Sequence, residues 1–266
     1  MFRAVTLAAL ITPLLMVAAA AQSASPSPEV LKDLAPTGRL RAGINLGNSV
    51  LAQGTTQDPR GLSVDLAREL AKRTNLPLDL VTFDAAGKVF DALKTNAWDI
   101  AFMAHEPRRA DQIEFTAPYV EIEGTYMVLN ESPLKSIDDV DKQGIRIAVG
   151  LNSAYDLYLT RTIKSATIVR AHTGGGSAMI EMFFKDKLDV AAGVRQALEA
   201  YAKTDPKVRV MDGRFQVIAQ AMGTPKGRTV AAGYLRTFIE EMKRSGFVAE
   251  GLKRSGQTAT VAAAAK

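Results

Sequence analysis

The sequence contains no cysteine among its 266 residues. This absence excludes a disulfide framework, a catalytic thiol and a metal site built on cysteine ligands. It also excludes a lipid anchor on an N-terminal cysteine. If the protein is exported, we therefore expect it to be released without an anchor.

Histidine is almost as scarce, since the chain has only His105 and His172. They do not form a His-x-x-x-His spacing, and we expect no metal site. By residue type alone, a catalytic triad could consist of Ser153, His172 and an aspartate. The Gly-x-Ser-x-Gly motif of hydrolase nucleophiles is missing, however. We expect no catalytic residues and no cofactor.

Charge of one sign is not concentrated anywhere, because the 33 Lys and Arg and the 28 Asp and Glu are spread along the chain. No basic stripe interleaved with aromatic residues is present, so we expect no nucleic-acid partner. The Gly-Gly-Gly-Ser run at 174–177 lacks the Gly-Lys-Ser/Thr ending of a P-loop. We interpret it as a loop before a helix that Ser177 caps.

The N-terminus carries a long apolar run. Arg3 precedes apolar residues 4–21, which end in three alanines, and this pattern predicts a cleaved signal peptide over 1–21. A membrane anchor is the alternative, but the run is short and Pro13 interrupts it. Cleavage after Ala21 would leave a net charge of 32 − 28 = +4. Export without an anchor favours the periplasm, with secretion to the medium as the other possibility.

Residues 22–36 contain a Ser-Pro-Ser-Pro run, and we expect a disordered leader there. Beyond them, apolar strands alternate with amphipathic helices, which predicts an α/β fold with parallel sheets. In the helix expected over 61–75, leucines share one face and Asn75 suits a left-handed C-terminal position. The first unit has expected strands at 40–44, 78–83 and 98–103 and helices at 61–75 and 88–95.

The pattern then restarts, so the chain is expected to hold two similar units, the second inserted into the first. Ligands bind outside the carboxyl ends of parallel strands. The carboxyl ends of the expected strands are followed by residues 45–48, 84–87 and 104–109. The second unit has expected strands at 145–149, 167–170 and 189–194, followed by a return strand at 215–222 and a helix at 230–244.

The stretch from His105 to Tyr119 is the most informative part of the sequence. Pro107 suits the first position of a short helix. Arg109 would then lie beside free backbone N–H groups, an arrangement that binds carboxylate or phosphate. The alternative from spacing alone is a solvated surface helix with two ordinary arginines.

Arg109 lies six residues before Phe-Thr-Ala-Pro-Tyr at 115–119 and follows a strand that carries Asp99. This order of motifs resembles the amino-acid-type periplasmic solute-binding proteins of ABC importers, family 3 of the bacterial extracellular solute-binding proteins. The likeness extends roughly over 38–256. It implies the two-lobed periplasmic binding protein fold, in which each lobe is a mainly parallel sheet flanked by helices. Two crossover strands would form the hinge, near 126–130 and 216–220.

The resemblance also implies domain boundaries and site residues. We expect one lobe over 37–127 and 219–256, a second over 128–218, and a disordered tail over 257–266. In this family the arginine grips the α-carboxylate of the ligand, and a small polar turn of the second lobe meets the same group. The expected ligand-binding residues are Asn45, Asn48, Ala104, Glu106, Arg109, Asn152, Ser153 and Arg195.

The chain departs from the family pattern at the site for the ligand's ammonium group. Members of the family bind the ammonium group with an aspartate of the second lobe. In this chain Val194 occupies that position, next to Arg195. A buried ammonium without an anionic partner costs several kcal/mol. Either Glu106, Glu123 or Asp84 replaces the aspartate, or the ligand has no free ammonium. Arg195 is read either as a ligand donor or as a solvated helix-start residue.

The resemblance predicts a monomeric binding protein that delivers a small carboxylate-bearing solute to an ABC permease. The expected ligand is an amino acid or derivative, with an organic acid as the second choice. One alternative is a periplasmic dehydratase-like enzyme in which Glu106 or Glu123 acts as a general acid. The other is a ligand sensor for a membrane receptor.

Overall fold

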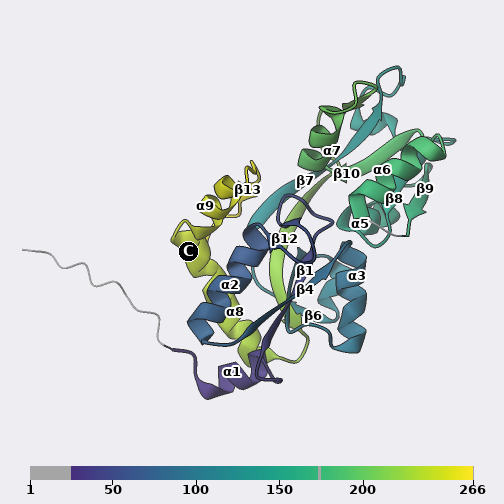
Figure 1. Ribbon diagram of the computed structural model, residues 1–266. Coiled ribbons are helices and arrows are strands. Elements are labelled where there is room, and N and C mark those ends of the chain that lie inside the picture. Colours follow the sequence, from purple (N-terminus) through teal and green to yellow (C-terminus); the bar gives the residue numbers. More distant parts are fainter. Residues whose placement is uncertain (1–24, 173–174, 266) are drawn as a thin grey trace, which may run out of the picture.

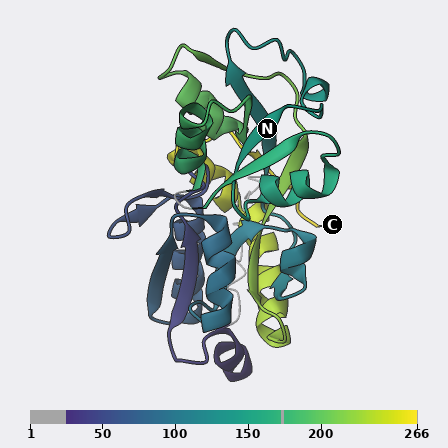
Figure 2. The ribbon, with the colours of Figure 1, turned by 90° about the vertical axis from the view of Figure 1, so that its right-hand side faces the viewer.

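The computed structural model describes residues 25–172 and 175–265. The chain folds into two α/β lobes, one above the other in Figures 1 and 2, which two long strands connect. The expected signal peptide over 1–21 lies outside the described residues. Within the described ranges, no helix combines the length and apolar character needed to cross a membrane.

The first lobe is built on a parallel sheet, as the strand–helix alternation predicted. Strand β1 (Leu40–Asn45) lies in its centre, between β4 (Leu78–Phe83) and β5 (Ile100–Ala104). Leucines of α2 (Leu62–Thr74) pack on one face with the two C-terminal helices. Asn75 ends α2 in the left-handed conformation, as predicted. The remaining elements of this lobe are β2 (Gln53–Gly54), β3 (Pro59–Arg60), α3 (Ala86–Asp91), η1 (Ala92–Thr95), α4 (Pro107–Ala110), β6 (Ile113–Phe115), α8 (Thr229–Arg244) and α9 (Phe247–Arg254).

The second lobe repeats the arrangement. Strand β8 (Arg146–Gly150) pairs in parallel with β9 (Thr167–Ala171) and with β10 (Val190–Val194). Helix α5 packs on one face of this sheet, and α6 and α7 pack on the other. These helices and the remaining elements are η2 (Ile137–Asp139), α5 (Ala154–Thr162), α6 (Gly175–Lys185), α7 (Arg195–Ala202) and β11 (Val208–Val210).

The two connecting strands, β7 (Val120–Leu129) and β12 (Gln216–Pro225), are antiparallel neighbours. They pair from Gln216 opposite Gly124 to Gln220 opposite Val120. The crossover expected at 216–220 coincides with this paired segment. The other crossover lies at 120–124, earlier than the expected 126–130, because β7 pairs with β10 of the second lobe from Gly124 onward.

The disordered leader expected over 22–36 is wrong for its second half. Residues Pro28–Leu34 form helix α1, in which the Ser27 hydroxyl accepts a hydrogen bond from the N–H of Val30 at 3.3 Å. The Asp33 carboxylate accepts a hydrogen bond from the N–H of Ala231 in α8 at 2.8 Å. The serine and proline that suggested disorder are therefore the N-cap and first position of a helix.

The disordered tail expected over 257–266 is also wrong in the described part. Residues Thr260–Val261 form strand β13, which pairs with the start of β7. The Lys243 ammonium of α8 lies nearly buried and donates to the carbonyls of Pro118 and Ala263 at 3.1 and 3.0 Å. Contacts with residues distant in the sequence hold this segment in place. Its amino-acid composition does not indicate these contacts.

A buried ion cluster holds the lower end of the first lobe together. The Asp99 carboxylate is fully buried and accepts hydrogen bonds from the guanidinium groups of Arg41 and Arg228, each at 2.8 Å. Burial, the largest influence, raises the pKa of this carboxyl, but the bonds from Arg41 and Arg228 together lower it below its ordinary value. Asp99 is therefore ionised and structural, and it lies at the opposite end of β5 from residues 104–109.

Candidate functional site

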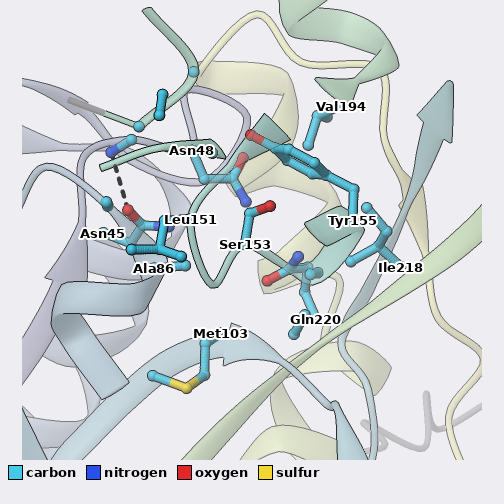
Figure 3. Close-up of a pocket in the computed structure, with 18 of the residues that line it drawn as sticks. Asn45, Asn48, Ala86, Met103, Leu151, Ser153, Tyr155, Val194, Ile218 and Gln220 are labelled. Atoms are coloured by element: carbon cyan, nitrogen blue, oxygen red, sulfur yellow. Dashed lines mark hydrogen bonds between the residues drawn. The ribbon is translucent and has the colours of Figure 1, made fainter. Parts of the chain in front are cut away.

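A cavity of about 70 Å³ lies between the lobes, at the carboxyl ends of β1, β5, β8 and β10 (Figure 3). This is the position predicted from the parallel sheets. A larger hollow of about 570 Å³ adjoins it and shares Asn48, Tyr155 and Val194 with it. We take the inner cavity as the candidate site because it alone of the two includes the buried Arg109.

Arg109 forms part of the wall of the cavity and is only 1% exposed. Pro107 begins the short helix α4, as predicted, and this places Arg109 at the helix's third position. Its guanidinium donates to the carbonyl of Ala104 at 3.1 Å and to that of Asn152, in the other lobe, at 2.9 Å. Burial lowers its pKa to about 10, so the group still carries a positive charge at neutral pH.

The alternative of two solvated arginines is wrong for Arg109 and right for Arg108, which is exposed. Arg108 nevertheless reaches across the cleft and donates to the side-chain oxygen of Asn152 at 3.3 Å. The two arginines thus contact one residue of the second lobe. Only Arg109 lines the cavity.

Asn45 and Asn48 lie in the loop after β1, and both line the cavity. The side-chain oxygen of Asn45 accepts a hydrogen bond from the N–H of Gly47 at 3.0 Å, drawn as a dashed line in Figure 3. The side-chain oxygen of Asn48 accepts one from the N–H of Val50 at 3.3 Å. Each amide oxygen thus has a backbone partner, which leaves the two NH₂ groups as donors.

The turn after β8 supplies the second lobe's polar contribution. Ser153 caps α5, because its hydroxyl accepts a hydrogen bond from the N–H of Asp156 at 3.0 Å, and it lines the cavity. Asn152 has a left-handed φ of 57° and donates its N–H to the Asp156 carboxylate at 2.8 Å. This turn therefore contributes a helix cap. A contact of the same turn with a ligand stays a prediction.

The structure places Ala104 on the cavity wall but not Asn152, Glu106 or Arg195. Glu106 is buried behind the wall, where its carboxylate accepts a hydrogen bond from Gln216 at 2.9 Å and forms an ion pair with Arg161 at 2.8 Å. The resemblance put Glu106 at the site, because Glu106 lies in the segment just before Arg109. Its side chain instead faces the second lobe and the hinge.

Arg195 belongs to a hinge cluster and does not face the cavity. Its guanidinium donates to the Glu123 carboxylate of β7 at 2.7 Å and to the carbonyls of Met211 and Gly213. Arg214 holds the other oxygen of Glu123 at 2.6 Å. The hydrogen bonds from Arg214 and Arg195 lower the pKa of Glu123. Neither expected role of Arg195, ligand donor or solvated helix start, fits these contacts.

The two lobes are in direct contact around the cavity. A Cβ atom added to Gly87 of α3 would lie 2.9 Å from the Cβ of Asn152 and 3.0 Å from the carbonyl of Leu151. One added to Gly175, across the cleft, would lie 2.6 Å from the carbonyl of Asp84. The described conformation is therefore closed, and these glycines permit the approach of the two backbones.

Several wall residues were not predicted from the sequence. The Tyr155 ring is buried, and burial raises the pKa of its hydroxyl. His172 follows β9 directly, so the rule of strand ends could have found it. Gly175 and Gly176 also line the cavity, although the glycine run at 174–176 was given little weight as a contact; residue 174 lies outside the described part. The further unpredicted residues are Met103, Gly150, Leu151, Ala154, Ala171, Ile218 and Gln220.

No metal centre is apparent in the described part of the chain, where no group of three or more His, Asp or Glu residues is placed to hold an ion. Among the residues that line the cavity there, Arg109, Tyr155 and His172 are the titratable ones. The arrangement therefore offers a buried cation, amide donors and a hydroxyl to a bound molecule.

Comparison with known proteins places this geometry in context. The family model of bacterial extracellular solute-binding proteins, family 3, matches residues 48–256. No curated protein matches the chain in sequence. The solved structures described next are 18–22% identical to the chain and agree with its two-lobed fold.

Three of these structures illustrate the likeness. A mutant of ArgBP from T. maritima is 18% identical with a TM-score of 0.73, covering 85% of this chain and 99% of that one. A putative ABC transporter binding component from Wolinella succinogenes, complexed with lysine, is 22% identical with a TM-score of 0.70, covering 82% and 95%. An ancestral amino acid-binding protein, a precursor of cyclohexadienyl dehydratase, is 20% identical with a TM-score of 0.71, covering 84% and 97%.

Proposed function

From the premise that this chain belongs to family 3 of the bacterial extracellular solute-binding proteins, we propose that it captures a small carboxylate-bearing solute between its lobes. The observation that carries the proposal is the buried guanidinium of Arg109 on the cavity wall. A carboxylate is the group whose geometry and charge match a guanidinium, because it accepts two parallel hydrogen bonds. The amide groups of Asn45 and Asn48 and the hydroxyl of Ser153 are further donors for the solute.

The binding cycle follows from the fold. The ligand meets Arg109 in the first lobe, and rotation about the paired segments of β7 and β12 then brings the turn at Ser153 over it. Closure is a shift between open and closed populations, and the ligand favours the closed one only by the contacts it gains there. The close approach of Gly87 to Leu151 and Asn152 limits that rotation.

Delivery to an ABC permease completes the proposal. Family membership and the neighbouring structures of amino acid-binding proteins support this role. Together with the predicted signal peptide over 1–21, they support a location in the periplasm. We propose that the protein acts there as a monomer and presents its closed form to the permease.

We propose no enzymatic activity, although one similar structure is the precursor of a dehydratase. The acids considered as general acids, Glu106 and Glu123, each form an ion pair with arginine away from the cavity. A carboxyl that acts as a general acid near neutral pH needs a raised pKa. The pKa of Glu123 is lowered instead.

A thermal-shift screen with small carboxylates and their uncharged amides tests the proposed function. A ligand that binds only the folded state stabilises it by RT ln(1 + [L]/Kd), so the melting temperature rises with ligand concentration. We expect at least one carboxylate to raise it while the matched amide does not. Equal shifts from an acid and its amide, or no shift from any carboxylate, would contradict the proposal.

A further inference from the structure

The cavity wall is positively charged and carries no acid. Among its described residues, none is Asp or Glu, and Arg109 is the buried cation. A ligand with one carboxylate and no other charge would neutralise this wall. A zwitterionic amino acid would bring an ammonium into the same space, where it needs an anionic or at least an accepting partner.

The acids nearest to the cavity are already paired with cations of the protein. Arg161 and Gln216 hold Glu106, while Arg195 and Arg214 hold both oxygens of Glu123. Asp84 lies on the outer hollow, about half exposed, and pairs with Lys88 at 2.7 Å. Asp156 is buried beneath the turn at Ser153, where Arg170 pairs with it at 2.9 Å. Each would have to leave its partner to meet an ammonium.

The two asparagines of the wall do not compensate for this. The side-chain oxygens of Asn45 and Asn48 accept hydrogen bonds from backbone N–H groups, so these amides offer donors to the cavity. Val194 stands at the end of β10 on the second-lobe side of the cavity, as Figure 3 shows. Met103 and Ile218 add apolar side chains to the wall. The site is therefore suited to hydrogen-bond acceptors and apolar groups.

We infer that the ligand is a small monocarboxylate whose other groups are uncharged, such as a 2-oxo or 2-hydroxy acid, and that α-amino acids are discriminated against. The inference rests on the proposed function, since it assigns the chemical class of the solute in that same cavity. A keto or hydroxyl oxygen next to the carboxylate accepts the amide hydrogen bonds that an ammonium would oppose.

Calorimetric titration with matched triplets tests the inference. Each triplet contains the 2-oxo, 2-hydroxy and 2-amino acid of one carbon skeleton, beginning with pyruvate, lactate and alanine and extending to branched skeletons. We expect the oxo or hydroxy member to bind at least 100-fold more tightly than the amino acid. Equal or tighter binding of the amino acids would overturn the inference and leave the proposed function intact. Failure of every member to bind, while another carboxylate binds, would overturn the inference alone; failure of every carboxylate tested would overturn both.

The substitution Val194→Asp provides a second test, with the isosteric Val194→Asn as its control. Aspartate there would supply the missing anion, so we expect tighter binding of the amino acid and at least tenfold weaker binding of the oxo acid. The uncharged asparagine should not improve amino acid binding. An equal effect of both substitutions would show that charge at this position does not select the ligand. If Val194→Asp does not fold by circular dichroism, the triplets on the natural protein alone decide.

Discussion

Arg161 and Glu106 come from different lobes and form an ion pair, with 2.8 Å between the guanidinium and the carboxylate. The Glu106 side chain is 3% exposed and that of Arg161 is 43% exposed. The pair exists only when the cleft is closed, because Arg161 lies on α5 of the second lobe and Glu106 lies beside α4 of the first lobe. It therefore stabilises the closed state relative to the open one.

The substitution Arg161→Gln should shift the lobes toward the open state. A half-exposed ion pair is worth up to about 1 kcal/mol, so we expect ligand affinity to fall roughly threefold to fivefold. Small-angle scattering should show a larger radius of gyration for the unliganded variant. Arg254→Gln, which removes an ion pair with Asp65 inside the first lobe, should change neither quantity.

Arg109→Ala should abolish binding of any carboxylate found by the screen. Removing one partner of a desolvated charge pair costs ~2–5 kcal/mol, which calorimetry would record as a loss of at least thirtyfold. Arg109→Lys should restore little, because an ammonium cannot make the two parallel hydrogen bonds of a guanidinium.

Arg108→Ala is the matched control for Arg109→Ala. Arg108 is exposed and donates a hydrogen bond to the Asn152 side chain across the cleft, so its removal should weaken binding no more than a few-fold. Comparable losses for Arg108→Ala and Arg109→Ala would contradict the assignment of Arg109 as the carboxylate partner.

Gly87→Ala should hinder closure. The added methyl group would meet the Cβ of Asn152 at 2.9 Å and the carbonyl of Leu151 at 3.0 Å, contacts that exist only in the closed state. We expect weaker ligand binding and a smaller compaction on binding, measured by scattering. Gly233→Ala in α8, where no atom lies within 4 Å of the added carbon, should leave binding unchanged and raise stability by up to about 1 kcal/mol.

Asp99→Asn should destabilise the first lobe without a direct effect on the cavity. Loss of the charge leaves Arg41 and Arg228 without their shared anion, at a cost of ~3–5 kcal/mol. The pKa of Asp99 is lowered in the folded state. Its stabilisation is therefore present above the unfolded pKa and is lost as the pH falls through the lower, folded value. Thermal melts of both proteins should differ most at neutral pH and converge in strong acid.

Local signals in the sequence were sufficient to predict the elements of the lobes. Helix α2 shows a repeating apolar face and an asparagine at its end, and both features act within a few residues. The burial of Arg109 could not be derived in this way, because spacing allowed a solvated helix equally well. Only the order of motifs around 99–119 distinguished the two alternatives.

The features that were predicted wrongly depend on contacts between distant residues. The crossover at 120–124 is set by pairing of β7 with β10 and β12, for which no local signal exists. Strand β13 is held by Lys243 and by the start of β7. Wall residues such as Gln220 lie on a crossover strand, so a rule based on strand ends does not reach them.

The pairing of β7 with β12 has a mechanical consequence. Two separate linkers would let the lobes slide, twist and swing independently, whereas a hydrogen-bonded ribbon resists sliding because its register would be lost. The paired strands bend easily in one direction only. A single angle between the two lobes therefore describes most of the motion. Because the chain has no cysteine, a single cysteine placed at the cleft rim would take one fluorescent label. The protein is thus suited to conversion into an optical sensor of its own ligand.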